Sequence, residues 1–316
     1  MEVIQEGNNF RLVSIDELPD ILQVLAKYLP SSLKFHQTIQ TYLKDRVWEF
    51  HFYVAKEWPE DPIILHFPGM TSTPNGELYE SFTVFCPTDR LDLIGLLQSE
   101  TVLIDWSRPL FMNFTHRAIM DRIEEFYQAM GGSMEKVAGD IYVLDGPPPD
   151  EIKLEELQGE DCEVLELREE HAKAIHDLYP ANDMESVKVF ERLIRALPAY
   201  GVFSGGQLAA WMVQSYYGAM FSMQTRPEFR RKGFGIHLAQ CLTRSVRNRG
   251  YIPFVVIRPE NDASLSLYNK LGFKRSYPTV RAILRPASEA TGESNGSEAP
   301  DNEPETESNE PQQEEQ

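Results

Sequence analysis

The chain has 316 residues, with 49 acidic against 30 basic side chains and a formal net charge of -19. This acidic balance argues against a nucleic-acid partner, because the chain would repel phosphates. No apolar run reaches the about 18 residues that a membrane-spanning helix needs, so we expect no membrane span. The three cysteines, Cys86, Cys162 and Cys241, fit neither a zinc motif nor a disulfide framework, and we expect no metal site.

The first 145 residues alternate helical and strand patterns. A stripe of Leu18, Leu22, Leu25 and Leu29 predicts a helix over residues 16–29. Strands are expected near 49–55, 63–67 and 81–85, and a second helix over 115–130. Domain 1–145 is therefore predicted to be mixed α/β.

Three consecutive prolines, at 147–149, mark the clearest break in the chain. Proline cannot continue a helix or a central strand, so residues 146–162 are predicted to be a linker between two domains. At the other end, residues 286–316 contain ten acids and no base and lack large apolar side chains. Such a composition predicts a disordered, solubilising tail.

The segment 163–285 is predicted to be the second domain. Its patterns predict a strand at 164–167, helices at 169–179 and 184–197, a hairpin at 201–215 with a turn at Gly205-Gly206, and a strand ending at Thr225. A helix to residue 249, a strand at 251–257, a helix at 261–271 and a strand at 281–284 follow. The order is β-α-α-β-β-β-α-β-α-β.

A basic, glycine-containing segment joins the strand at Thr225 to the next helix. Residues 225–258 hold eight basic side chains against one acid, Glu228. Two glycines, Gly233 and Gly235, allow a tight turn and a close approach by another molecule. Unpaired amides at a helix start are a preferred phosphate site, so the ligand is expected to carry phosphate.

The spacing Arg230-x-x-Gly233-x-Gly235 matches neither a P-loop nor a dinucleotide fingerprint. It resembles the pyrophosphate loop of the GCN5-related N-acyltransferase superfamily, which binds acyl-coenzyme A. Residues 261–273 resemble the closing helix of that superfamily, with Asn261, a Leu-Tyr pair ending at Tyr268 and a Leu-Gly-Phe end. The element order of 163–285 is also that of the superfamily.

In the first domain, residues 29–34, 56–59 and 105–106 resemble the glycine N-acyltransferase-like family. The resemblance spans roughly residues 15–285 and implies an α/β (α+β) fold with a central mixed sheet flanked by helices. The N-terminal domain would be a degenerate copy of the acyltransferase domain. The implied reaction is direct aminolysis of an acyl-coenzyme A thioester by glycine or another small primary amine.

The resemblance also assigns site residues. Tyr268 would be the catalytic acid that protonates the leaving thiolate. The pantetheine arm would lie along the end of a strand, the pyrophosphate would bind in the glycine loop, and Asn261 would cap a helix and touch the cofactor. The cofactor-binding set is thus Met223, Gln224, Thr225, Arg230, Arg231, Lys232, Gly233, Phe234, Gly235, Ile236 and Asn261.

One departure from the family concerns the general base. The glutamate that the family carries before the glycine loop corresponds here to Ala219, and no carboxylate lies between Gln207 and Glu228. A histidine (His171, His176 or His237), Tyr216, Tyr217 or water could replace it, and the sequence favours none. Two alternatives stay open: an acyltransferase for a different amine or a protein acceptor, and a non-catalytic acyl-coenzyme A-binding protein.

The N-terminus carries neither a secretory signal nor an Arg-rich presequence, so the expected location is cytoplasmic. The family resemblance makes mitochondria the alternative. The expected partners are acyl-coenzyme A and a small amine. A monomer is compatible with the sequence, which does not determine the oligomeric state.

Overall fold

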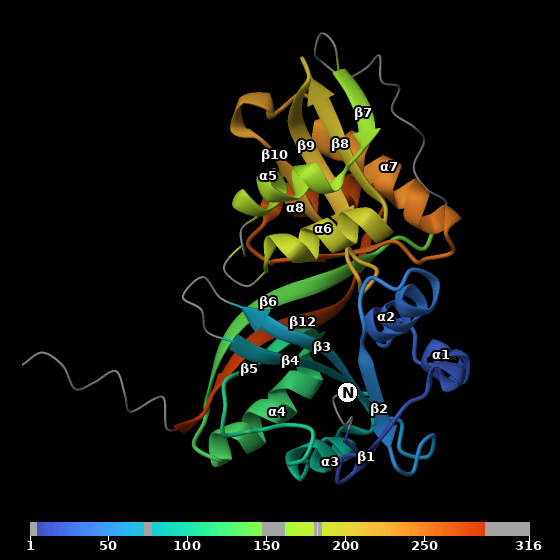
Figure 1. Ribbon diagram of the computed structural model, residues 1–316, viewed down its shortest axis with the longest axis vertical. Coiled ribbons are helices and arrows are strands. Elements are labelled where there is room, and N and C mark those ends of the chain that lie inside the picture. Colours follow the sequence, from blue (N-terminus) through green and yellow to red (C-terminus); the bar gives the residue numbers. More distant parts are fainter. Residues whose placement is uncertain (1–4, 73–77, 147–161, 180–181, 183–184, 288–316) are drawn as a thin grey trace, which may run out of the picture.

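The computed structural model describes residues 5–72, 78–146, 162–179, 182 and 185–287. Figure 1 shows two lobes stacked along the long axis, with the N-terminal half below and most of the C-terminal half above. Nearly all of the predicted linker and of the predicted acidic tail lies outside the described residues.

The N-terminal half forms a sheet flanked by helices. Its bounds are β1 Phe10–Leu12, α1 Leu18–Ala26, α2 Leu33–Lys44, β2 His51–Ala55, β3 Ile64–Ser72, β4 Leu78–Phe85, α3 Ile94–Gln98, β5 Leu110–His116, α4 Arg117–Ala129 and β6 Ser133–Val143. In α4, Ile119, Ile123 and Phe126 recur at helical spacing and are buried against the sheet. These apolar contacts fix the helix on its sheet.

The C-terminal half repeats this element order. It contains β7 Cys162–Glu166, α5 Ala172–Asp177, α6 Val187–Ala196, β8 Ala199–Ser204, β9 Gln207–Gln214, β10 Met220–Thr225, α7 Phe234–Asn248, β11 Phe254–Ile257, α8 Asp262–Lys270 and β12 Lys274–Arg285. The predicted hairpin is present: β8 and β9 pair across Gly205 and Gly206, which both have positive φ. Each half is therefore one copy of the same β-α-α-β-β-β-α-β-α-β unit.

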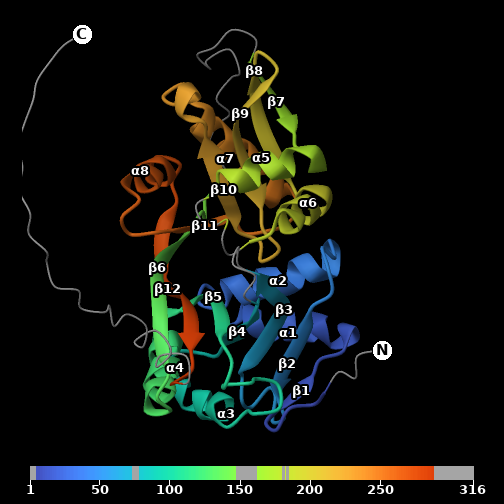
Figure 2. The same cartoon turned by 60° about the vertical axis from the view of Figure 1, so that its left-hand side comes forward.

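The two halves exchange their last strands. The larger sheet has the order β1-β2-β3-β4-β5-β12-β6-β11, and the smaller has the order β10-β9-β8-β7. Strand β12 inserts between β5 and β6 and pairs antiparallel with both, while β6 pairs antiparallel with β11. The last strand of each half thus lies next to the fifth strand of the other (Figure 2).

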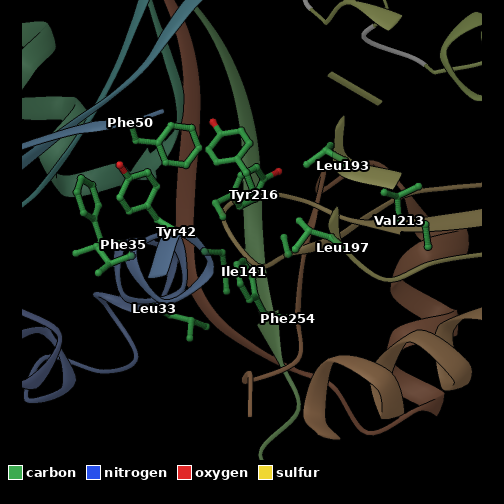
Figure 3. Close-up of a cluster of buried hydrophobic side chains, with 14 of the residues drawn as sticks. Leu33, Phe35, Tyr42, Phe50, Ile141, Leu193, Leu197, Val213, Tyr216 and Phe254 are labelled. Atoms are coloured by element: carbon green, nitrogen blue, oxygen red, sulfur yellow. The ribbon is translucent and has the colours of Figure 1, made fainter. Parts of the chain in front are cut away.

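A common hydrophobic core joins the halves where they meet. Figure 3 shows Phe50 of the N-terminal half next to Tyr216 of the C-terminal half, with Phe35 and Tyr42 on one side of this pair and Leu193 on the other. The Phe50 and Tyr216 rings meet edge to face at 5.3 Å between centroids. A fully buried side chain of this size contributes about 1.5–3 kcal/mol, so this core resists separation of the halves.

Polar contacts border the same interface. Asp45, which follows α2, forms an ion pair with Arg249 and accepts a hydrogen bond of 3.1 Å from the Tyr251 hydroxyl. The Lys44 ammonium lies 5.0 Å from the centre of the Tyr251 ring. The end of α2 is thereby attached to the loop between α7 and β11.

The structure confirms the mixed α/β fold and adds elements that the sequence patterns did not predict. These are β1, α2, α3, β5 and β6. The first part of β6 is exposed and polar, and the strand becomes buried only towards its end, so it lacks an alternating pattern. The closing strand is also longer than predicted, because β12 spans two partners over Lys274–Arg285.

The strand exchange predicts that the halves depend on each other to fold. A fragment ending at residue 146 would lack β12 between β5 and β6, and a fragment starting at 162 would expose β11 and β12 edges. We expect each fragment alone to be insoluble or to lack a cooperative unfolding transition, and the two co-expressed fragments to co-purify. Cooperative thermal unfolding of either isolated fragment, followed by circular dichroism, would contradict this.

Candidate active site

A cleft of about 250 Å³ opens between β10 and β11, in the C-terminal half. These two strands belong to different sheets, so no ladder of backbone hydrogen bonds closes the space between them. Strands β10 and β11 and helix α8 form most of its wall, and β5, β12 and the loops after α5 and β9 complete it. The lining residues are Phe114, Tyr179, Tyr217, Ala219, Met220, Phe221, Ser222, Met223, Gln224, Val255, Val256, Ile257, Arg258, Asn261, Ser264, Tyr268 and Arg281. Two arginines and no acid are among these described residues, so the cleft favours an anionic ligand.

Strand β10 carries a bulge on its cleft side. Its pairing with β9 shifts register between Phe221 and Gln224, and Ser222 has a left-handed φ of 54°. A bulge takes backbone groups out of the ladder and turns them towards a ligand. The buried Ser222 hydroxyl finds no hydrogen-bond partner among the described residues. Of the strand residues predicted to hold the pantetheine arm, Met223 and Gln224 line the cleft, whereas Thr225 does not.

The glycine loop enters α7 through two left-handed residues. Arg231 has φ 64° and Gly233, the N-cap of α7, has φ 82°. No side chain caps this helix start, so the amides of Phe234, Gly235 and Ile236 have no side-chain partner there. A left-handed arginine is strained, and such strain is found at ligand-binding loops.

The charges of the loop face solvent while its apolar residue anchors it. Arg230 and Arg231 are exposed and Lys232 is half-buried, with its ammonium 5.2 Å from the centre of the Phe229 ring. The side chain of Phe234 is buried in the core beneath the loop, so only its backbone amide is available to a ligand. Unpaired amides and nearby cations together make an anion site.

Tyr268 lies on α8 and is almost fully buried at the wall of the cleft. Its hydroxyl is 3.9 Å from the Met212 sulfur and 3.9 Å from the Met223 sulfur. Burial raises the pKa of this phenol above its ordinary value, so it stays protonated at neutral pH. Because thioethers are weak acceptors, the proton remains available to a stronger one.

Asn261 begins the helix that carries Tyr268. Its side-chain oxygen accepts a hydrogen bond of 3.1 Å from the Ser264 amide, as an N-cap does. Asn261 also lines the cleft, so the capping role and the predicted contact with the cofactor are compatible.

The structure narrows the candidates for a base. Ala219 lies in the cleft wall, at the place where the family's glutamate was expected. His171 accepts a hydrogen bond from the Arg168 amide, and His237 is buried on α7; none of the three candidate histidines lines the cleft. Burial raises the pKa of Tyr216 and of Tyr217, so both phenols stay neutral and are poor bases.

A carboxylate that the sequence patterns did not indicate lies next to the cleft. Glu185, just before α6, lines a smaller cavity of about 30 Å³ together with Asn113, Tyr216 and Arg281. Burial raises the pKa of its carboxyl to about 7, against a lowering by Arg281. In the sequence, an acid two residues before a helix is an ordinary helix-start residue, so nothing distinguished it.

The N-terminal half has no equivalent of the glycine loop. Its segment between β4 and α3 contains no glycine, and α3 spans five residues where α7 spans fifteen. Between the ends of β4 and β5 remains a space of about 20 Å³, into which the buried Lys34 projects. Lys34 donates to the carbonyls of Asn113 (2.5 Å) and Phe114 (3.1 Å), and burial lowers its pKa to about 7.

Comparison with known proteins agrees with this geometry. The family model described as FR47-like protein matches residues 199–282, which include β10, the glycine loop and α8. No curated protein matches the chain.

Several solved structures share the fold. A Drosophila protein superposes with a TM-score of 0.73 at 18% identity, over 89% of this chain and 100% of its own. A GCN5-related N-acetyltransferase from Sphaerobacter thermophilus gives 0.51 at 13% identity, over 90% of this chain and 97% of its own. A tandem protein of the same superfamily, from the clavulanic acid biosynthesis pathway, superposes with a TM-score of 0.51 at 11% identity, over 88% of this chain and 98% of its own. The chain therefore has the fold of the GCN5-related N-acetyltransferases, in a tandem arrangement.

Two further observations concern the described part of the chain. It contains no helix long and apolar enough to cross a membrane. It also brings no three His, Cys, Asp or Glu side chains together in a way that could hold a metal ion.

The loop geometry predicts that alanine is harmful at Gly233 and tolerated at Gly235. Gly233→Ala forces a left-handed alanine and should lower the free energy of unfolding by about 1–2 kcal/mol. Gly235→Ala is the matched control: its added methyl would lie 3.6 Å from Leu267 and 3.7 Å from Met223, which are ordinary contacts. It should stay within about 1 kcal/mol of the wild type in urea unfolding. Equal effects would argue against the left-handed turn.

Proposed function

We propose that this protein is an acyl-coenzyme A-dependent N-acyltransferase that acts by direct aminolysis. The fold and the FR47-like match support such an enzyme in general. The main observation behind the proposal is that the glycine loop, the cleft and the Tyr268 hydroxyl lie next to one another. The Met223 sulfur lies 3.7 Å from the position of a methyl on Gly235 and 3.9 Å from the Tyr268 hydroxyl. One side chain thus separates the proposed pyrophosphate loop from the proposed acid.

In this assignment the amides of Phe234, Gly235 and Ile236 bind the pyrophosphate, with Arg230, Arg231 and Lys232 adding charge. The pantetheine arm lies in the cleft along the bulged strand β10. The amine nitrogen attacks the thioester carbon, the carbon–sulfur bond breaks, and coenzyme A leaves as a thiolate. Tyr268 gives its proton to the sulfur and recovers one from the nitrogen, so amide and free thiol result.

For the acceptor, we propose glycine or another amino acid. Two features support an acceptor that carries a carboxylate. Arg281 lines both the main cleft and the smaller cavity, and Arg258 lines the main cleft. An arginine binds a carboxylate well through its paired donors. A panel of amino acids against the matching amino-acid amides, assayed by release of free coenzyme A, tests this. Equal rates for acid and amide would favour the alternative, a different amine or a protein acceptor.

Reversing the loop charge should abolish cofactor binding. Arg231→Glu combined with Lys232→Glu places two carboxylates beside the pyrophosphate, and we expect the Kd for coenzyme A in calorimetry to rise at least about 100-fold. Lys27→Glu with Arg117→Glu, at exposed positions of the N-terminal half, makes the same change in net charge and should leave the Kd unchanged. Unchanged affinity in the loop variant would refute the phosphate assignment.

Removing the Tyr268 hydroxyl should separate chemistry from binding. Tyr268→Phe keeps the buried ring, which packs against Phe273 at 5.1 Å, but removes the proton donor. We expect kcat to fall about 100-fold with little change in the Kd for coenzyme A. An equal loss in affinity would mean that the tyrosine serves packing instead.

The wild-type protein tests the non-catalytic alternative. If it binds coenzyme A but no amine raises thiol release above background, the protein is a non-catalytic binder.

A further inference from the structure

The small cavity that contains Glu185 adjoins the main cleft. The two share five lining residues, Phe114, Tyr179, Tyr217, Phe221 and Arg281, and so meet at a common wall. The main cleft reaches Tyr268 and the glycine-loop side of β10, whereas the small cavity reaches neither. A molecule in the small cavity would therefore lie next to the main cleft, at the wall that the two share.

Both halves of the chain build this cavity. Phe111 and Asn113 come from β5, Arg281 from β12, and Ser215 and Tyr216 from the turn between β9 and β10. Six of the twelve lining residues are aromatic, and the polar groups are the carboxylate of Glu185, the guanidinium of Arg281, the Asn113 amide and the hydroxyls of Ser215 and three tyrosines. This is the composition of a site for a small polar molecule that must be oriented.

We propose that this cavity is the acceptor site and that Glu185 is the general base that takes a proton from the acceptor ammonium. The assignment rests on the proposed acyltransfer. It fills the role left open by Ala219, because among the described residues that line either cavity Glu185 is the only carboxylate.

The backbone at Glu185 is held in place from α5. The Nε2 atom of His176 donates to the Glu185 carbonyl at 2.7 Å, and the His176 ring packs edge-on against Phe190 of α6. His176, which the sequence offered as a base, is thus a positioning residue. The chain then enters α6, where Val189 and Leu193 line the same cavity.

The groups that face Glu185 set its proton affinity. Tyr179, which follows α5, and Tyr216 and Tyr217, which follow β9, stay neutral because burial raises the pKa of each. Arg281 of β12 is the cation that lowers the pKa of Glu185 against the effect of burial, which raises it to about 7. Lys34 of α2 lies 5.1 Å from the Tyr217 ring, but its two hydrogen bonds go to backbone carbonyls.

A carboxylate with a pKa of about 7 can accept a proton from an ammonium group at neutral pH. A proton moves from the acceptor ammonium to the Glu185 carboxylate, and the neutral amine attacks the thioester carbon. The nitrogen loses its second proton, through Tyr268, to the departing sulfur, and Glu185 then releases its proton to water. The products are an amide, free coenzyme A and one proton, so atoms and charge balance.

Glu185→Gln tests the assignment because glutamine keeps the shape and cannot take the proton. With glycine as the acceptor at pH 7, we expect kcat to fall about 100-fold or more, with the KM for acyl-coenzyme A unchanged. Glu191→Gln, on α6 and outside both cavities, is the matched control and should behave as wild type. Wild-type kcat in Glu185→Gln would overturn the inference.

A second readout separates base catalysis from a structural role. An acceptor that is already neutral at the assay pH, such as a hydrazide or a hydroxylamine, needs no base, so Glu185→Gln should use it at nearly the wild-type rate. A variant that is merely misfolded, or has a damaged pocket, would lose both acceptors equally, and that result would also overturn the inference.

The pH dependence of kcat/KM gives a third readout of the role of Glu185. Below its pKa, Glu185 is protonated and inactive, so wild-type kcat/KM should rise with pH and level off above about 7. In Glu185→Gln only the neutral amine reacts, so kcat/KM should keep rising through 7 towards the pKa of the acceptor ammonium. Arg281→Met removes the cation that favours the carboxylate and should move the levelling-off to higher pH. If no amine is acylated by the wild type, the proposed function fails. If acylation occurs but Glu185→Gln still levels off above pH 7 as the wild type does, only this inference fails.

Discussion

The exchange of β6 and β12 between the halves is the constraint from which the rest of the architecture follows. Because β11 pairs with β6 and not with β10, the C-terminal half is divided between two sheets. The edges of β10 and β11 are left unpaired towards each other, and the cleft opens between them. The same exchange brings Arg281, on β12, to the cleft wall. The strand exchange that joins the two halves therefore also creates the cleft.

The two halves differ at the position of the cleft. Both have the same order of elements, yet β4 and β5 still pair in parallel over Glu80–Phe82 and Leu110–Met112, whereas β10 and β11 do not pair. The N-terminal half also lacks the glycine loop and a long helix behind it. Lys34 projects into the space that remains and contacts Tyr217 across the interface. The N-terminal copy therefore supports the wall of the other copy's site.

The local features of the site could be predicted because they depend on neighbouring residues. The bend at Gly233, the cluster Arg230–Lys232 and the cap at Asn261 each need only a few consecutive side chains, and the structure places them at two helix starts. The long strand β6 could not be predicted, because its exposed first half has no alternating pattern and its second half is buried by distant partners. The helix α2 was missed although it carries a large part of the interface core.

The sequence by itself determined the mixed α/β class, the acidic character of the chain, the loop that presents amides and cations to an anion, and the tyrosine that follows it. These are set by composition and by short spacings, which act over a single turn or helix. Only the tertiary structure decided which strands share a sheet, where the cleft ends and which carboxylate stands beside it. Glu185 is 34 residues from Ala219 in the chain, and only folding brings it to the cavity that adjoins the cleft wall containing Ala219. Burial among aromatic rings and a cation from the other sheet then give it a proton affinity that no local pattern encodes.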